Sequence, residues 1–146
     1  MSSLVWHHTD PSAVELSIKT VVIDELVKAG ELPSPKFVKI DVEGHELAAL
    51  RGAQLLLGSR RIRDIIFEEF SPYPAATHRL LERCGYTTLH FEQGLLGPRL
   101  RRTRPGYRPP LYSPPNFLAT LDPARMADKF RVRRWHWLSA GRRRVL

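Results

Sequence analysis

The chain has 146 residues, of which 42% are hydrophobic and 26% are charged; this length allows one domain with a buried core but not two. The composition is ordinary for a globular protein, and no apolar run approaches the roughly 18 residues that a membrane span needs. The single cysteine, Cys84, excludes an internal disulfide and a multi-cysteine metal site.

The two ends of the chain differ in composition. The N-terminal sequence MSSLVWHHTDPSA lacks the basic region and the apolar core of a signal peptide, so we expect a cytoplasmic protein without a membrane partner. Residues 1–98 carry 10 Lys and Arg against 13 Asp and Glu, whereas residues 99–146 carry 13 against 2. We expect this basic third to be a solvated face; its alternative use is to bind nucleic acid or an acidic partner.

Short extended runs alternate with helical runs in the first half of the chain, which is typical of an α/β fold with crossover helices. The predicted elements, in chain order, are a strand over 15–20, a helix over 21–30, a strand over 37–41, one helix ending at Gly58 and a strand over 63–70. The helix before Gly58 carries Leu47, Leu50, Ala53 and Leu57 on one face, so we expect these side chains in the core.

The second half of the chain continues the alternation but includes a long irregular segment. It predicts, in order, a helix within 75–86 closed by Gly85, a strand over 86–92, a loop over 93–115, a strand over 116–121 and a final helix capped by Asp122. The loop 93–115 is basic and rich in proline, and loops of this length in compact domains are usually functional or disordered. We expect residues 139–146 to be a disordered basic tail.

Cysteine and histidine residues do not form an obvious catalytic or metal-binding group. Cys84 lies on the apolar face of a predicted helix, so we expect a core residue rather than a nucleophile. We expect His7, His8, His78 and His136 at the surface.

Three carboxylates crowd one glycine in the segment KIDVEGHELAALRGA, which begins at Lys39. They are Asp41, Glu43 and Glu46, and the glycine is Gly44, whose missing side chain permits a positive φ. Like charges repel at this density, so the arrangement must serve a ligand, stabilise a helix terminus or face water.

Position along the predicted sheet favours a ligand. Asp41 ends a strand, and Glu68 and Glu69 end the next one. In open α/β sheets, ligands bind beyond the carboxyl ends of the strands. We therefore expect these carboxylates to line one rim of the sheet.

The rim carboxylates have structural and metal-binding alternatives. Asp41 can accept backbone amides, and acids in a first helical turn such as Glu46 gain roughly 0.3–1 kcal/mol from the helix dipole. Hard cations also bind clustered carboxylates, but the segment lacks the spacing of an EF-hand loop, and we expect no metal site. His45 can act as a base or simply face solvent.

The segment FVKIDVEGHELAALRGAQLLL (37–57), followed by RDIIFEE (63–69), resembles the core of the FkbM-type methyltransferases, which use S-adenosylmethionine. The shared pattern is a hydrophobic residue, Lys-Ile-Asp-x-Glu-Gly-x-Glu, and then Leu50, Gly52 and Ala53 in register. The resemblance covers residues 2–121 and is strongest over 37–70.

The resemblance implies an enzyme that transfers a methyl group from S-adenosylmethionine to a hydroxyl oxygen of a sugar or natural product. The acceptor would be a small molecule or a glycan. Nucleic acid is not the expected partner, because basic patches of this kind are more often a solvated face. The implied site residues are Asp41, Glu43, His45 and Glu46, on the acceptor side. No cofactor-binding residue is identified, because the sequence contains no G-x-G motif.

The resemblance also implies a Rossmann-like class I methyltransferase sheet that is only partly present. Residues 1–138 would supply its fourth to seventh strands, without the opening strand and glycine-rich turn, so this truncated domain would be inactive by itself. The alternative is a non-catalytic half-domain that uses its basic tail for binding. In either case the strand 37–41 has an unpaired apolar edge, and we expect self-association through it.

Overall fold

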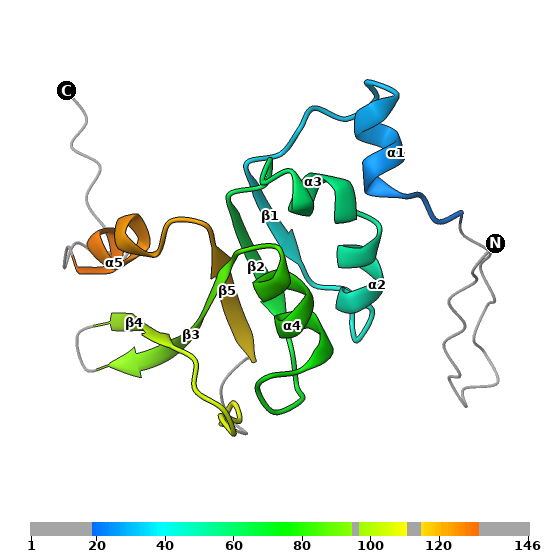
Figure 1. Cartoon of the computed structure of the whole chain (residues 1–146). Helices are drawn as coiled ribbons and strands as arrows, with labels where there is room; N and C mark the ends of the chain where they lie inside the picture. The colour runs from blue at the N-terminus through cyan, green and yellow to red at the C-terminus, as the bar shows by residue number, and fades with distance from the viewer. Residues whose placement is uncertain (1–18, 95–96, 111–114, 132–146) are drawn as a thin grey trace, which may run out of the picture.

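The computed structural model describes residues 19–94, 97–110 and 115–131 of the chain (Figure 1). In these ranges five strands form one mixed sheet in the order β1-β2-β5-β3-β4. The strands are β1 (Phe37–Ile40), β2 (Asp64–Glu68), β3 (Thr87–Gly94), β4 (Gly97–Arg102) and β5 (Asn116–Thr120). The helices are α1 (Ile23–Lys28), α2 (Glu46–Arg51), α3 (Gln54–Gly58), α4 (Ala76–Arg83) and α5 (Pro123–Arg131). The predicted α/β class is confirmed.

Three strands of the sheet run in the same direction. β1 and β2 are parallel, and β5 is antiparallel to both of its neighbours, β2 and β3. The carboxyl ends of β1, β2 and β3 therefore lie along the same edge of the sheet. This edge carries the acidic residues that the sequence placed at strand ends.

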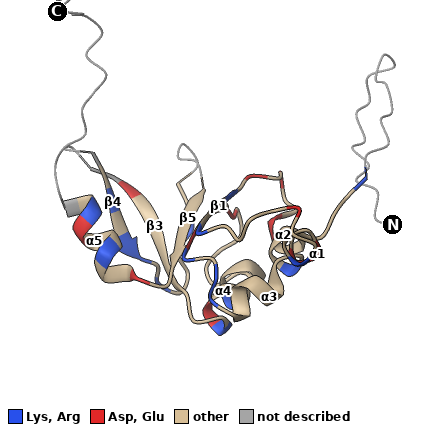
Figure 2. Cartoon of the chain, turned by 90° about the horizontal axis from the view of Figure 1, so that it is seen from above, with Lys and Arg blue, Asp and Glu red and all other residues tan. Residues whose placement is uncertain are grey.

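The core lies between the sheet and the helices α2, α3 and α4, which gather on one side of the sheet (Figure 2). Alternate residues of a strand point into this core, as the period of two in a strand requires. Ile65 and Phe67 of β2 are examples, and both are fully buried. Leu50, Ala53 and Leu57 meet them from the helices, which confirms three of the four predicted core positions. Leu47 packs against the cluster while remaining partly exposed.

The single helix predicted to end at Gly58 is two helices, α2 and α3. Asp24 of α1 contacts the junction between the two helices. Its backbone N–H donates to the carbonyl of Gly52 at 2.9 Å. The Asp24 carboxylate accepts the N–H groups of Leu55 at 2.7 Å and Leu56 at 3.1 Å. A side chain about 30 residues earlier thus caps α3, a contact that no local pattern could predict.

Part of the loop predicted over 93–115 is a strand. Residues 97–102 form β4, which pairs with β3 as an antiparallel hairpin at the edge of the sheet. Edge strands tolerate proline and charged residues because one side of the backbone faces solvent. The Pro98 and arginine residues that indicated a loop are therefore compatible with an edge strand.

Other predicted elements have the expected places. Gly85 follows α4 with a φ of 90°, as predicted for the residue that closes this helix, and Gly30 follows α1 with a φ of 75°. Asp122 caps α5, because its carboxylate accepts the backbone N–H of Arg125 at 3.0 Å. The predicted strand over 15–20 and tail over 139–146 lie wholly or mainly outside the described residues.

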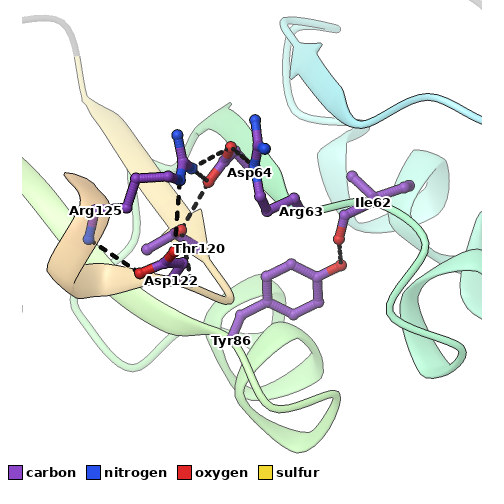
Figure 3. A network of polar contacts seen from close by, with 7 residues as sticks. All are labelled: Ile62, Arg63, Asp64, Tyr86, Thr120, Asp122 and Arg125. Carbon is purple, nitrogen blue, oxygen red and sulfur yellow. Dashed lines mark hydrogen bonds and ion pairs between the residues drawn. The ribbon is translucent and has the colours of Figure 1, made fainter. Parts of the chain in front are cut away.

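A buried ionic network fixes α5 to the sheet (Figure 3). Asp64 opens β2 and is almost fully buried. Its carboxylate accepts hydrogen bonds from Arg125 at 2.5 and 2.6 Å, from Arg63 at 2.8 Å and from Thr120 at 2.7 Å. Burial alone would raise the pKa of Asp64, but the bonds from Arg63 and Thr120 and the charge of Arg125 lower it overall.

The expectation that His78 lies at the surface is wrong. The His78 ring is fully buried and packs edge-on against Phe67, Tyr73 and Phe117, with ring centroids 4.6–5.4 Å apart. Its Nδ1 accepts the backbone N–H of Ala75 at 3.1 Å. His78 lies in the first turn of α4, on the side of the helix that faces the sheet. Because histidine is polar, the sequence did not indicate that this position is buried.

We expect His78 to make the protein less stable in mild acid. Burial lowers the pKa of His78 below 6.5, against the opposing charges of Glu69 and Glu82. The unfolded chain therefore takes up a proton near pH 6.5 that the folded chain resists, and the free energy of unfolding falls as the pH drops. Urea unfolding should show this loss between pH 7 and pH 5.5, and for a single histidine the loss is at most about 1.4 kcal/mol per pH unit. A His78→Phe variant with the same slope would contradict this.

β1 lies at one edge of the sheet in the part of the chain that the structure describes. Phe37 at its start is 53% exposed. An open, apolar edge favours pairing with another chain, so we expect concentration-dependent association. Sedimentation velocity should show it. Phe37→Pro should reduce it, because the Lys36 carbonyl bonds to β2 and the next residue, Phe37, therefore points its N–H to the open edge. A monomer at all concentrations would contradict the expectation.

Candidate functional site

The acidic rim lies where β1 and β2 end. Asp41 directly follows β1, and Glu68 is the last residue of β2. Burial raises the pKa of Glu68, and the nearby charges of Asp41, Glu43 and Glu46 raise it further. The four carboxylates therefore act on one another electrostatically, as the strand-end positions predicted. We call Asp41, Glu43, Glu46 and Glu68 the acidic rim.

The loop after β1 is held in a left-handed conformation. Glu43 has a φ of 49° and Gly44 a φ of 91°; the second value confirms the expected use of glycine. Glu46 is almost fully buried, and its Oε1 accepts the backbone N–H groups of Val42 and Gly44, both at 3.3 Å. Of the three acids in this segment, Glu46 has the structural role.

Asp41 is an exposed carboxylate of the rim that forms an ion pair. Its side chain is 41% exposed and contacts Lys39 Nζ at 2.6 Å. This hydrogen bond, together with the charge of Asp41, raises the pKa of Lys39. A carboxylate that is fixed by one neighbour and open to solvent can accept a hydrogen bond from a ligand hydroxyl.

Two further residues of the predicted site differ in their surroundings. His45 lies just before α2, is exposed and makes no side-chain cap. Glu69 turns away from the rim, because its carboxylate accepts bonds from the Thr77 hydroxyl at 2.6 Å and the Ser71 N–H at 2.8 Å. Burial would raise the pKa of Glu69, but these bonds lower it overall. The structure thus brings Glu68 to the rim and not Glu69.

No group of three or more His, Cys, Asp or Glu side chains within the described ranges has the geometry to hold a metal ion. None of the helices there combines the length and apolar character needed to cross a bilayer. Cys84, the free cysteine, packs partly buried against the core.

We expect Glu46 to position the rim rather than react. Replacing Glu46 with Ala leaves the N–H groups of Val42 and Gly44 without their carboxylate, so stability should fall by about 1–2 kcal/mol. Glu46→Gln retains a carbonyl acceptor of the same length and should cost less. Thermal melts of both variants measure the difference; equal losses would show that hydrogen bonding by Glu46 does not hold the loop.

The fold and the rim define an α/β protein whose acidic side chains gather at the carboxyl ends of its strands, where this class of sheet holds its ligands. The family described as the methyltransferase FkbM domain matches residues 2–88, more than half of the chain. The chain therefore belongs to this family, as its sequence motif predicted. The match contains all four residues of the acidic rim.

A curated relative supports the same class of enzyme. The chain is 60% identical over 37 residues to the hexuronic acid methyltransferase AglP of Haloferax volcanii. The matched stretch covers 25% of this chain and 16% of that relative. Family and relative are both named as methyltransferases, which confirms the predicted family. No solved structure matches the chain.

Proposed function

We propose that this protein transfers a methyl group from S-adenosylmethionine to an oxygen of a sugar or natural-product acceptor. The observation that carries the proposal is the place of Asp41, exposed at the end of a strand inside the family-matched segment. The name of the matched relative, a hexuronic acid methyltransferase, supports a sugar as the acceptor. Methyl transfer depends mainly on alignment of the acceptor oxygen with the methyl group.

In this proposal Asp41 contacts the acceptor. Its carboxylate would accept a hydrogen bond from the acceptor hydroxyl and orient the oxygen. It would take up the hydroxyl proton as the methyl group leaves the sulfur of the donor and bonds to that oxygen. Lys39, whose Nζ lies 2.6 Å from Asp41 Oδ2, holds the carboxylate in place. Glu43 and Glu68 add negative charge to the rim, Glu46 maintains the loop, and His45 is an accessory base on the solvent side.

The methyl donor implied by the family supplies an electrophilic methyl group when bound. The given sequence contains no G-x-G turn of the kind that approaches a nucleotide cofactor. We therefore assign no residue of this chain to the cofactor. The acidic rim is an acceptor-side feature.

We further propose that β1, β2, β3 and β5 are the fourth to seventh strands of a Rossmann-like sheet. The parallel pair β1 and β2, connected through α2 and α3, supports this, because such crossovers are the unit of these folds. An experimental structure of the protein with cofactor would test it; a strand other than a parallel neighbour beside β1 would contradict it.

The proposed reaction is tested with the protein as its gene encodes it. Transfer of a labelled methyl group from S-adenosylmethionine should be followed with glucuronic acid, glucose and a hydroxylated natural product as acceptors. Label in any acceptor, dependent on native protein, supports methyl transfer. Absence of both cofactor binding by calorimetry and label in every acceptor would overturn the proposal.

A further inference from the structure

A basic pocket lies on β3, β4 and the turn that follows β4, and the acidic rim contributes nothing to its lining. It has a volume of about 460 Å³. Its lining residues are His90, Glu92, Arg101, Arg102, Arg104 and Tyr107. β4 was predicted to be a loop, so the sequence did not indicate that these side chains share one pocket.

Positive charge exceeds negative charge in this pocket. Arg101 is paired with Glu92, with Nε and Oε2 3.0 Å apart. Arg102 and Arg104 are exposed and form no ion pair with any residue that the structure describes. Two guanidinium groups are therefore left to bind an anion, and guanidinium is the side-chain group best suited to carboxylate and phosphate.

A buried polar group faces the same space. His90 is only 9% exposed, and its Nδ1 has no hydrogen-bond partner among the described residues. The ring stacks on Tyr107 with centroids 3.9 Å apart, which fixes its orientation. A buried ring nitrogen without a partner is unfavourable, and an oxygen atom of a ligand would satisfy it.

The basic pocket is close to the edge of the sheet that carries the acidic rim. Strand register aligns His90 with Phe117, Phe117 with Phe67, and Phe67 with Ile40. His90 is therefore level with the residue before Asp41, three strands away. At about 4.8 Å per strand the separation is about 14 Å, a distance that an extended ligand such as an oligosaccharide can span.

We propose that the basic pocket binds the oxyanion of an acidic ligand, a carboxylate or a phosphate. Arg102 and Arg104 neutralise its charge, and His90 donates one hydrogen bond to it through Nδ1–H. That this oxyanion belongs to the methyl acceptor rests on the proposed function; binding of the anion itself does not.

The test is direct binding without cofactor. Glucuronate, inorganic phosphate and glucose are titrated into ¹⁵N-labelled protein, and the amide shifts of His90, Arg101 and Tyr107 are followed. Glucuronate or phosphate should bind at the pocket and glucose should not, and added salt should weaken binding. Tighter binding of glucuronate identifies a carboxylate ligand, and tighter binding of phosphate a phosphorylated one.

The variant Arg102→Gln/Arg104→Gln should weaken anion binding about tenfold, which is about 1.4 kcal/mol. Both side chains are exposed, so the variant should fold normally. Arg99→Gln is the matched control, because Arg99 lies on β4 but does not line the pocket. Equal affinity of the double variant and the control, or equal shifts with glucose, would overturn the inference. Methyl transfer without anion binding would overturn the anion pocket and leave the proposed function in place. Anion binding without methyl transfer would support the pocket and count against the proposed function.

Discussion

Replacement of Asp64 by Ala is expected to lower the free energy of unfolding by about 3 kcal/mol, because it leaves buried partners without their common acceptor. Asp64 has a side chain only 5% exposed and binds Arg125, whose side chain is 23% exposed. Thr120, which also donates to Asp64, is fully buried. Without these contacts α5 should separate from the sheet. Urea unfolding followed by circular dichroism measures the change in the free energy of unfolding.

Two control variants show whether the network or the cap of α5 causes the loss. Arg63→Gln removes a partner that is 47% exposed, so its effect should be below about 1 kcal/mol. Asp122→Ala removes the cap of α5 and should cost about 1 kcal/mol. If Asp64→Ala were no worse than either control, the buried network would not be what fixes α5.

Replacement of Asp41 by Asn is expected to reduce methyl transfer by about 10²-fold or more, with little change in stability. The amide keeps the size of the side chain but cannot take up a proton, and it loses the ion pair with Lys39. That ion pair is solvent-exposed and contributes little to folding. Initial rates of methyl transfer in the protein as its gene encodes it, with thermal melts alongside, measure both quantities.

Glu43→Gln is the matched control for Asp41. It also removes one negative charge from the acidic rim, but Glu43 does not end the strand. A rate reduction of less than about tenfold, or 1.4 kcal/mol, is expected. Unchanged turnover in Asp41→Asn, or equal reductions in both variants, would contradict the proposed role of Asp41 in taking up the proton of the acceptor.

The positions of the predicted site residues in the fold depend on local rules. A hydrophobic run followed by Asp41 places that residue at a strand end whatever the rest of the chain does, and Gly44 has the positive φ that its position predicted. Glu46 belongs to the same motif, but its burial and its two backbone bonds follow from how the loop folds back. The sequence alone did not show that Asp41 is exposed and that Glu46 is the carboxylate that holds the loop.

Long-range contacts decide what local patterns leave open. The basic pocket depends on pairing between β3 and β4, and the composition of β4 resembles that of a loop because edge strands are not required to be apolar. His78 is buried because aromatic rings from the sheet and from the loop before α4 surround it. Neither environment is encoded by neighbours in the chain.

By itself the sequence determined the α/β class, the order of most elements, the family motif and the position of Asp41, since these follow from the period of apolar residues and from turn chemistry over a few residues. Only the tertiary structure decided that Asp24 divides one predicted helix into two and that Asp64 fixes α5. It also gathered His90 and the arginines of β4 into one pocket. The reason is physical: these contacts join residues far apart in the chain, and their partners are selected by packing of the whole sheet.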